Sequence, residues 1–396
     1  MEKEKQFFLQ VLADYMNKRP TQVPGDLDWS VLKEIGQAHQ LTGVIYHQCK
    51  NSIVQSGLPD VEKVKWKRSY MYNFLLYSKR MALLKQIDEA FQKENIPYLI
   101  VKGTEIAKYY SVPAQRTMTD SDLLVHAEDK QHACDVLAGL GFKMDSRYPH
   151  EWPGLKNDIA IELHHKLIYD YSVELESIRN WGETVWENVV KHSNKVQCEL
   201  NLTYHLVYTM LHLRKHLLQE GIGFRQFMDV AILALQPGIN WQQVELWISE
   251  FNLDKFSQIC FAFCRKWFDC QIQYGNVELD EDFYNEITKK IIAGGVFGSQ
   301  ENETKENNVK ENIIFNEVRF AKSSSTLRIL KRFFLPYNVM RTVTYCKFLD
   351  GRPYLLPVAW CWRLVYRFGK VVPLLKGAYD SETIKKKEDM LAKWGL

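Results

Sequence analysis

The sequence TDSDLLV at residues 119–125 decides which fold the chain adopts, because it places two carboxylates at the start of an apolar run. It predicts a β-strand over residues 120–126, in which successive side chains point to opposite faces of a sheet. Asp120 and Asp122 therefore share one face, with their Cα atoms about 6.6 Å apart, while alternate apolar residues face a core. Two carboxylates placed in this way suit a hard cation such as Mg²⁺, but two solvated acids at a strand edge would produce the same pattern.

A second alternating strand is predicted at residues 159–165, where the sequence runs IAIELHH. Its apolar residues face one way, and Glu162 and His164 face the other. If this strand pairs beside the first, three carboxylates meet over one face, and such a cluster repels itself unless a cation neutralises it. The predicted catalytic and metal-binding residues are Asp120, Asp122 and Glu162. In the rival interpretation, Glu162 is an exposed acid paired with a lysine such as Lys166.

A turn suited to phosphate lies upstream, where VKGT at residues 101–104 joins a predicted buried strand, 98–101, to a short helix, 105–110. Glycine permits a close backbone approach to an anion, and amides at a helix N-terminus favour phosphate. An ordinary strand-to-helix turn has the same form. Arg116, four residues before Asp120, would contact a triphosphate or pair with an acid. The predicted nucleotide-binding residues are Lys102, Gly103, Thr104 and Arg116.

The rest of the chain is predicted to be mostly helical. Residues 61–94 form one long helix whose apolar residues, many of them aromatic, recur every three or four positions and predict core packing. Beyond Pro97 the period changes, and short apolar runs flank a helix at 127–140 and a further strand at 142–144. Later helices are predicted at 203–218, 224–235, 241–251 and 256–268. The polar stretch 299–312 contains no aromatic residue and suggests a mobile loop or linker.

Composition bounds the class of protein. The 396 residues carry a net charge of +3, so a nucleic-acid partner would have to bind a local patch. No CxxC pair occurs among the eight cysteines, and Cys260, Cys264 and Cys270 lie in an apolar stretch, as reduced core cysteines do. The N-terminus lacks the apolar core of a signal peptide, and no uncharged apolar run reaches about 18 residues. A cytoplasmic location is therefore predicted.

The order of these motifs resembles the polymerase-β-like nucleotidyltransferase superfamily, in which a Gly-Ser turn holds triphosphate and three acids hold two metals. The closer resemblance is to a broad bacterial family of nucleotidyltransferases with the signature L-K-G, Y, R-x-x-x-D-x-D-L-L-V, G-F/Y and E-L-H. Thr104 stands where the superfamily usually has serine, and Ser121 where an apolar residue is commoner. The matching residues are Val101, Lys102, Gly103, Tyr109, Arg116, Asp120, Asp122–Val125, Gly141, Phe142 and Glu162–His164, with a looser match at His212, His216, Arg225 and Asp229.

The resemblance implies an α+β fold, in which a small mixed β-sheet nucleotidyltransferase core is embedded in N- and C-terminal helical regions. The predicted division of the chain is an N-terminal helical region (1–95), the nucleotidyltransferase α+β core (96–170), a helical domain (171–298), a polar loop or linker (299–315) and a C-terminal helical region (316–396).

The function that the resemblance implies is transfer of a nucleoside monophosphate from a nucleoside triphosphate, such as ATP, to an acceptor, with release of pyrophosphate. Asp120 and Asp122 would hold Mg²⁺ or Mn²⁺, and Glu162 would bind the catalytic metal and help to activate the acceptor. The sequence does not identify the acceptor, and its candidate classes are a protein, an RNA end, a sugar and a small molecule. Two other interpretations are a catalytically degenerate nucleotide-binding or interaction protein of the same fold, and a membrane-surface protein of polysaccharide assembly.

The membrane interpretation depends on residues 352–376, where tryptophans and tyrosine alternate with arginine and lysine, as in an interfacial helix. A terminal helix docked on the core, with its charges in solvent, has the same pattern and is favoured. Two further patterns lie on predicted helices. His205, His212 and His216 share one helical face, as zinc ligands or as core residues beside the active site. Arg225 and Asp229 are spaced to form an ion pair along one helix, or to line the active-site wall.

Overall fold

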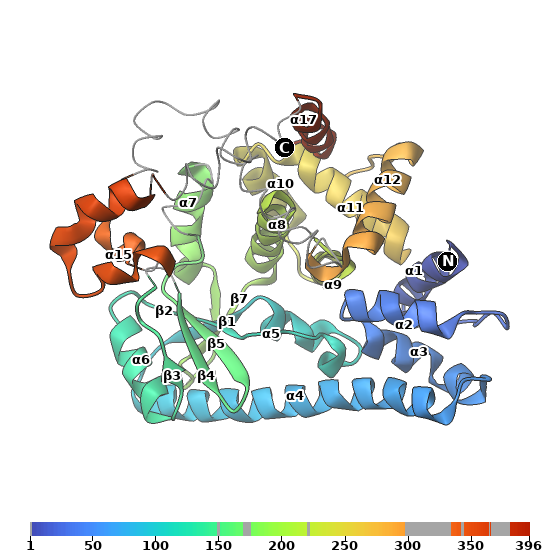
Figure 1. The fold of residues 1–396 in the computed structure, drawn as a ribbon, viewed down its shortest axis with the longest axis horizontal. Helices are drawn as coiled ribbons and strands as arrows, with labels where there is room; N and C mark the ends of the chain where they lie inside the picture. Colours follow the sequence, from blue (N-terminus) through green and yellow to red (C-terminus); the bar gives the residue numbers. More distant parts are fainter. Residues whose placement is uncertain are drawn as a thin grey trace.

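The computed structural model (Figure 1) confirms an α+β fold with one mixed sheet between helices. It describes residues 2–148, 151–168, 176–219, 222–297, 334–341, 344–363, 365 and 381–396. The predicted loop at 299–315 lies outside the described residues, as do residue 364 and residues 366–376 of the predicted amphipathic segment. The strands are β1 (Tyr98–Val101), β2 (Asp122–Val125), β3 (Lys143–Met144), β4 (Trp152–Lys156), β5 (Ile159–His164), β6 (Val189–Lys191) and β7 (Gln197–Leu200).

The helices precede, cover and follow this sheet. On the N-terminal side they are α1 (Glu2–Met16), α2 (Trp29–Ala38), α3 (Thr42–Gln55) and α4 (Asp60–Lys93). Within the sheet region they are α5 (Gly103–Ile106), α6 (Lys130–Gly139) and α7 (Glu176–Glu183), with the 3-10 turns η1 (Ala107–Tyr109), η2 (Pro113–Gln115) and η3 (Thr184–Glu187). Then follow α8 (Leu202–Gln219), α9 (Phe224–Ala234), α10 (Trp241–Glu250), α11 (Asp254–Phe268), α12 (Glu281–Gly294), η4 (Gly295–Phe297), α15 (Tyr337–Met340), η5 (Thr344–Leu349), η6 (Pro353–Leu355) and α17 (Ser381–Trp394).

The sheet has the strand order β3-β4-β5-β2-β1-β7-β6. The two strands predicted to carry acids are neighbours, because β2 runs parallel to β5 with Asp122 opposite Glu162. On its other side, β2 pairs antiparallel with β1. The predicted strand at 120–126 is shorter than expected, since β2 begins at Asp122. Backbone pairing with β5 starts one residue earlier, where the Ser121 amide donates to the Ala160 carbonyl at 3.1 Å.

Each face of the central strands packs on its own hydrophobic core. One core joins Leu123 and Leu163 to apolar residues of α4 and α6. The other joins Leu124 on the opposite face to a larger cluster that includes α8, α9 and α11. Burial on both faces explains why β1 is a continuous apolar run, YLIV, and not an alternating one.

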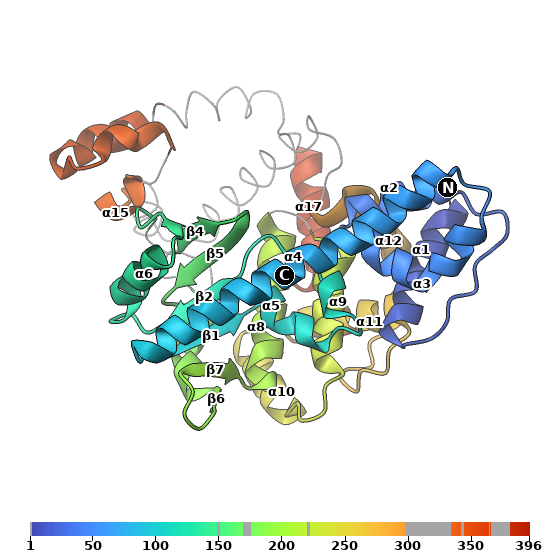
Figure 2. The ribbon, with the colours of Figure 1, turned by 90° about the horizontal axis from the view of Figure 1, so that it is seen from below.

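The long helix α4 crosses the molecule beneath the sheet and beside the N-terminal helices (Figure 2). Its predicted core stripe is buried at both ends, where Trp66 and Ile87 are 1% and 0% exposed. The middle of the stripe differs from the prediction, since Met81 is 39% exposed. The neighbouring Arg80 is buried instead, because this part of the helix faces polar groups of the segment that leads into β2.

Three strands, β4, β6 and β7, were not predicted, because their sequences are short or contain residues that disfavour a strand. WPGLK in β4 contains proline and glycine, and QCEL in β7 is short and half polar. β7 nevertheless pairs parallel to β1, so the sheet extends to residue 200. None of the described helices could cross a membrane. The three cysteines expected in the core are buried and reduced, whereas Cys361 is exposed.

The described part of the predicted amphipathic segment belongs to a small packing unit. Ala359 is buried against Met340, Cys346 and Leu349, whereas Trp362 is 48% exposed. The final helix, α17, carries Trp394, whose side chain is fully buried. It stacks on Phe263 of α11, with ring centroids 5.0 Å apart, so the C-terminus docks on the helical core.

The contact between α4 and the sheet can be tested at Phe91, which is fully buried and meets the Tyr98 ring edge-on at 5.2 Å. We expect Phe91→Ala to lower the free energy of unfolding by about 3–5 kcal/mol, because it leaves a cavity in the core. Met71→Ala on the exposed side of the same helix should change it by less than about 0.5 kcal/mol. Urea unfolding of both variants measures the difference, and equal effects would contradict the packing described.

Candidate active site

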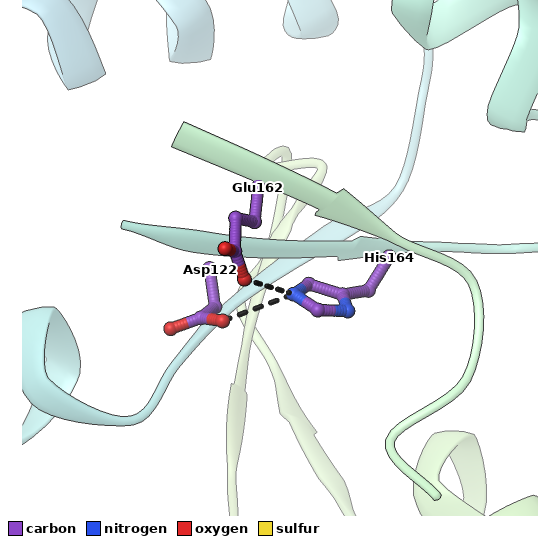
Figure 3. Close-up of side chains that lie close together, drawn as sticks. All are labelled: Asp122, Glu162 and His164. Atoms are coloured by element: carbon purple, nitrogen blue, oxygen red, sulfur yellow. Dashed lines mark hydrogen bonds and ion pairs between the residues drawn. The ribbon is translucent and has the colours of Figure 1, made fainter. Parts of the chain in front are cut away.

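The pairing of β2 with β5 gathers three potential ligands over one face of the sheet. Asp122 and Glu162 are register partners, and His164 follows two residues later on the same face. The ligand atoms of these three residues all lie within 4.8 Å of one another. The His164 ring is directed at both carboxylates (Figure 3), with Nε2 2.9 Å from Asp122 Oδ1 and 3.3 Å from Glu162 Oε2. Within the described residues this is the only such group.

Asp122 is a buried carboxylate that stays ionised. Its side chain is 5% exposed, and burial alone would raise its pKa. The Lys102 ammonium, 2.5 Å from Asp122 Oδ1, and the adjacent His164 outweigh this effect and hold the pKa of Asp122 well below its ordinary value. Reciprocally, burial disfavours the charge on Lys102, but the negative charge of Asp122 raises the pKa of that lysine.

His164 is affected by the same carboxylates. Burial opposes a charged imidazole, but the hydrogen bonds to Asp122 and Glu162 raise the pKa of His164 above its ordinary value. The rival prediction, that Glu162 is an exposed acid paired with Lys166, is wrong. Lys166 lies 2.8 Å from Glu183, and the Glu162 side chain is only 28% exposed.

Asp120 lies just before β2 and outside the three-residue group. Asp120 was predicted to lie on the strand with Asp122. Its side chain is not part of the compact group formed by Asp122, Glu162 and His164. It is still within electrostatic reach, because burial and then the negative charges of Asp122 and Glu162 raise the pKa of Asp120. Asp120 therefore lies at the edge of the acidic site.

Arg80 of α4 holds the segment that carries Asp120 and Asp122, and it was not among the predicted site residues. Its guanidinium is 4% exposed and donates to Ser121 Oγ at 2.8 Å. It also donates to the carbonyls of Met118, Thr119 and Ala160 at 3.2–3.3 Å. A signal was present in the sequence, since Arg80 lies four and seven residues before Leu84 and Ile87, on their buried face.

The same contact explains the unusual serine between the two aspartates. Ser121 is 1% exposed and points away from the carboxylates, where its Oγ accepts from Arg80. The Thr104 hydroxyl also donates to Ser121 Oγ at 2.9 Å. A polar residue is required here because an apolar one would leave buried donors unsatisfied.

The predicted phosphate turn lies beside Asp122 in a strained conformation. Lys102 adopts φ 58° and ψ −139°, in a region that costs a non-glycine residue about 1–3 kcal/mol. Gly103 allows the close approach of Arg116, because an added Cβ would lie 2.5 Å from the Arg116 Nη1 atom. The turn therefore has no room for another side chain at Gly103.

Arg116 is neither solvent-exposed nor free, since it forms a buried two-point contact with Asp229 of α9. Its Nη2 and Nε atoms donate to the carboxylate at 2.5 and 3.1 Å, and the Tyr110 hydroxyl donates to the same group at 2.7 Å. The predicted Arg225–Asp229 pair is therefore wrong. Arg225 donates to the side chain of Gln40 at 2.7 Å and to Thr117, because α9 turns it toward those residues.

Tyr208 and His212 of α8 lie within electrostatic range of Lys102. Burial raises the pKa of Tyr208 to about 12 against the opposing effect of Lys102. The alternative interpretation of His205, His212 and His216 as a zinc site is not supported, because no such metal-ligand group forms among the described residues. His212 pairs with His216, their Nε2 atoms 2.9 Å apart, and His205 is fully buried with its pKa lowered by burial to about 4.

Comparison with protein-family models agrees with the predicted class of enzyme. A family model described as "Uncharacterised nucleotidyltransferase" matches residues 25–269. A solution structure of the antibiotic-resistance factor ANT(2″)-Ia matches 44% of this chain and 91% of that chain, with 12% identity and a TM-score of 0.33. A crystal structure of ANT(2″)-Ia in complex with adenylyl-2″-tobramycin matches 44% and 97%, with 11% identity and a TM-score of 0.32. No curated protein matches the chain.

The Arg80 contact can be tested by a conservative change. We expect Arg80→Lys to lower the free energy of unfolding by about 1–3 kcal/mol or more, because one ammonium cannot satisfy the acceptors that a planar guanidinium spans. Hydrogen exchange should also become faster at residues 118–122. The control is Arg68→Lys, on the exposed side of α4, which should have little effect. If the two variants unfold alike in urea, Arg80 does not hold the acid-bearing segment.

Proposed function

The chain belongs to a family of uncharacterised nucleotidyltransferases, and we propose that it transfers a nucleoside monophosphate to an acceptor in a metal-dependent reaction. The observation that carries the proposal is the buried, ionised Asp122 with Glu162 beside it and Lys102 directed at it. Nucleotidyl transfer needs charge stabilisation and positioning more than a covalent catalyst. A fixed carboxylate pair with an adjacent ammonium supplies both.

The donor set fits a divalent cation. Asp122 and Glu162 offer carboxylate oxygens, His164 offers a ring nitrogen, and Asp120 adds a further carboxylate at the edge. We propose that Asp120, Asp122 and Glu162 hold Mg²⁺ or Mn²⁺ together with the triphosphate. When bound, such an ion neutralises phosphate charge and increases the acidity of an attacking hydroxyl.

The predicted phosphate turn would bind the triphosphate. Lys102 is the only one of its side chains with a charge, and its ammonium already lies among the acids. In our proposal it moves from Asp122 to the phosphates when the nucleotide binds. The Thr104 hydroxyl donates to Ser121 and the Arg116 guanidinium donates to Asp229. In our proposal these two residues keep their partners and hold the turn in place, and they do not contact the phosphates.

Glu162 would act on the acceptor. The acceptor oxygen forms a new bond to the α-phosphorus, the bond from the α-phosphorus to the bridging oxygen breaks, and pyrophosphate leaves. The proton of the attacking hydroxyl passes to the Glu162 carboxylate, whose side chain is 28% exposed and so accessible to a second substrate. Asp122, at 5% exposure, is too enclosed for this role.

The reaction can be tested by measuring pyrophosphate release with Mg²⁺ or Mn²⁺ and each nucleoside triphosphate. We expect Glu162→Gln to retain nucleotide affinity and to lower turnover by about 100-fold or more, since it removes a group that acts in the transition state. The matched control is Glu183→Gln, an acid paired with Lys166. Nucleotide binding without any pyrophosphate release by the wild type would instead indicate a catalytically degenerate protein.

The role of Lys102 has its own test. We expect Lys102→Met to weaken nucleotide binding by about 10-fold or more, because it removes the positive charge beside the phosphates. A fluorescent ATP analogue measures the affinity, and Lys108→Met, a lysine paired with Glu199, is the control. Unchanged affinity in a folded Lys102→Met protein would exclude the lysine from the nucleotide site.

A further inference from the structure

We propose that His164 is itself a metal ligand, and that the site therefore selects Mn²⁺, Co²⁺ or Zn²⁺ over Mg²⁺. This inference rests on the proposed function, because it concerns the same metal site. It goes further by adding an imidazole, that of His164, to the carboxylates of the proposed ligand set.

The position of the His164 ring supports the proposal. Its Nε2 atom lies between the two carboxylates, 2.9 Å from Asp122 Oδ1 and 3.3 Å from Glu162 Oε2. The His164 side chain is only 7% exposed, and Figure 3 shows its ring pointing toward both carboxylates. The His164 nitrogen and the oxygens of Asp122 and Glu162 all lie within 4.8 Å of one another, as the ligand atoms of one metal ion would.

The backbone fixes this arrangement in advance. Glu162 and His164 are two residues apart on β5, so the alternation of a strand directs both to one face. The register with β2 brings Asp122 opposite Glu162. The three donors thus come from two adjacent, paired strands, which keeps the group rigid and favours binding.

The chemistry of the donors determines which ions fit. Mg²⁺ strongly prefers oxygen ligands and dehydrates reluctantly. Imidazole suits Zn²⁺, Co²⁺ and related transition metals, while carboxylates also accept Mn²⁺. One imidazole with two carboxylates therefore favours a transition metal. Asp120, the third carboxylate that an all-oxygen site would need, lies outside the compact group of Asp122, Glu162 and His164.

An alternative role for His164 is to hold the two carboxylates by hydrogen bonds without touching the metal. The two roles differ in one observable, which is whether the metal ion is bonded to a nitrogen. Pulsed electron paramagnetic resonance of bound Mn²⁺ detects a directly bonded ¹⁴N nucleus. The measurement uses the intact chain and does not depend on turnover.

The experiment titrates the full-length protein with Mn²⁺, with and without a non-hydrolysable nucleotide, and records the ¹⁴N coupling. We expect coupling in the wild type and its loss in His164→Gln, with Mn²⁺ affinity reduced by about 10-fold or more. Mg²⁺ affinity should change less, so the preference for Mn²⁺ should shrink. The control is His165→Gln, the adjacent histidine, whose Nδ1 lies 3.1 Å from Lys130 Nζ.

Two results would overturn the proposal in distinguishable ways. If Mn²⁺ binds, Asp122→Asn abolishes binding and no ¹⁴N coupling appears, His164 is not a ligand but the proposed metal-dependent function stands. If wild-type protein binds no Mn²⁺ even with nucleotide, or Asp122→Asn binds it equally well, the proposed metal site fails as well. The wild-type spectrum decides the ligand even if His164→Gln does not fold.

Discussion

The guanidinium of Arg80 is the contact on which the candidate site depends. It is buried on α4, and it reaches the carbonyls of Met118 and Thr119, the Ser121 hydroxyl and the Ala160 carbonyl. These groups belong to the segment that leads into β2 and to its partner β5. One side chain therefore fixes both acid-bearing strands to the longest helix, and a buried network of this kind is strong only when all of its members are satisfied.

The other side of this segment carries the charges. Removing carboxylates from water costs several kcal/mol unless they are paired, and here Lys102 and His164 pair with Asp122. The site is consequently assembled before any substrate arrives. In the proposed reaction, a nucleotide and a metal would replace contacts that the protein already makes, so their binding would need little reorganisation.

Part of this arrangement could be predicted from sequence alone. The alternation in IAIELH placed Glu162 and His164 on one face, and the acidic DSD stretch identified the neighbouring strand, because both patterns depend only on local geometry. The alternation of apolar and polar residues does not predict the residue at which a strand begins. Asp120 was assigned to the strand, but β2 starts at Asp122, and His164 takes the third place in the compact group.

The contacts missed from the sequence are all between distant segments. Arg80 and Ser121, and Arg116 and Asp229, are 41 and 113 residues apart, and no periodicity relates them. The strands β4, β6 and β7 were missed because they are short or contain proline and glycine, and pairing with neighbouring strands stabilises them. Pairing with β1, β5 and β7 determines where these three strands lie in the sheet.

We propose that this site cleaves a nucleoside triphosphate at its α-phosphorus. The most direct measurement incubates the pure protein with ATP labelled at either the α- or the γ-phosphate, together with Mn²⁺ and cell extract. We predict that the α-label becomes attached to an acceptor, that the γ-label appears in pyrophosphate, and that Asp122→Asn abolishes both. Attachment of the γ-label, or no transfer from any nucleoside triphosphate with either metal, would contradict the claim.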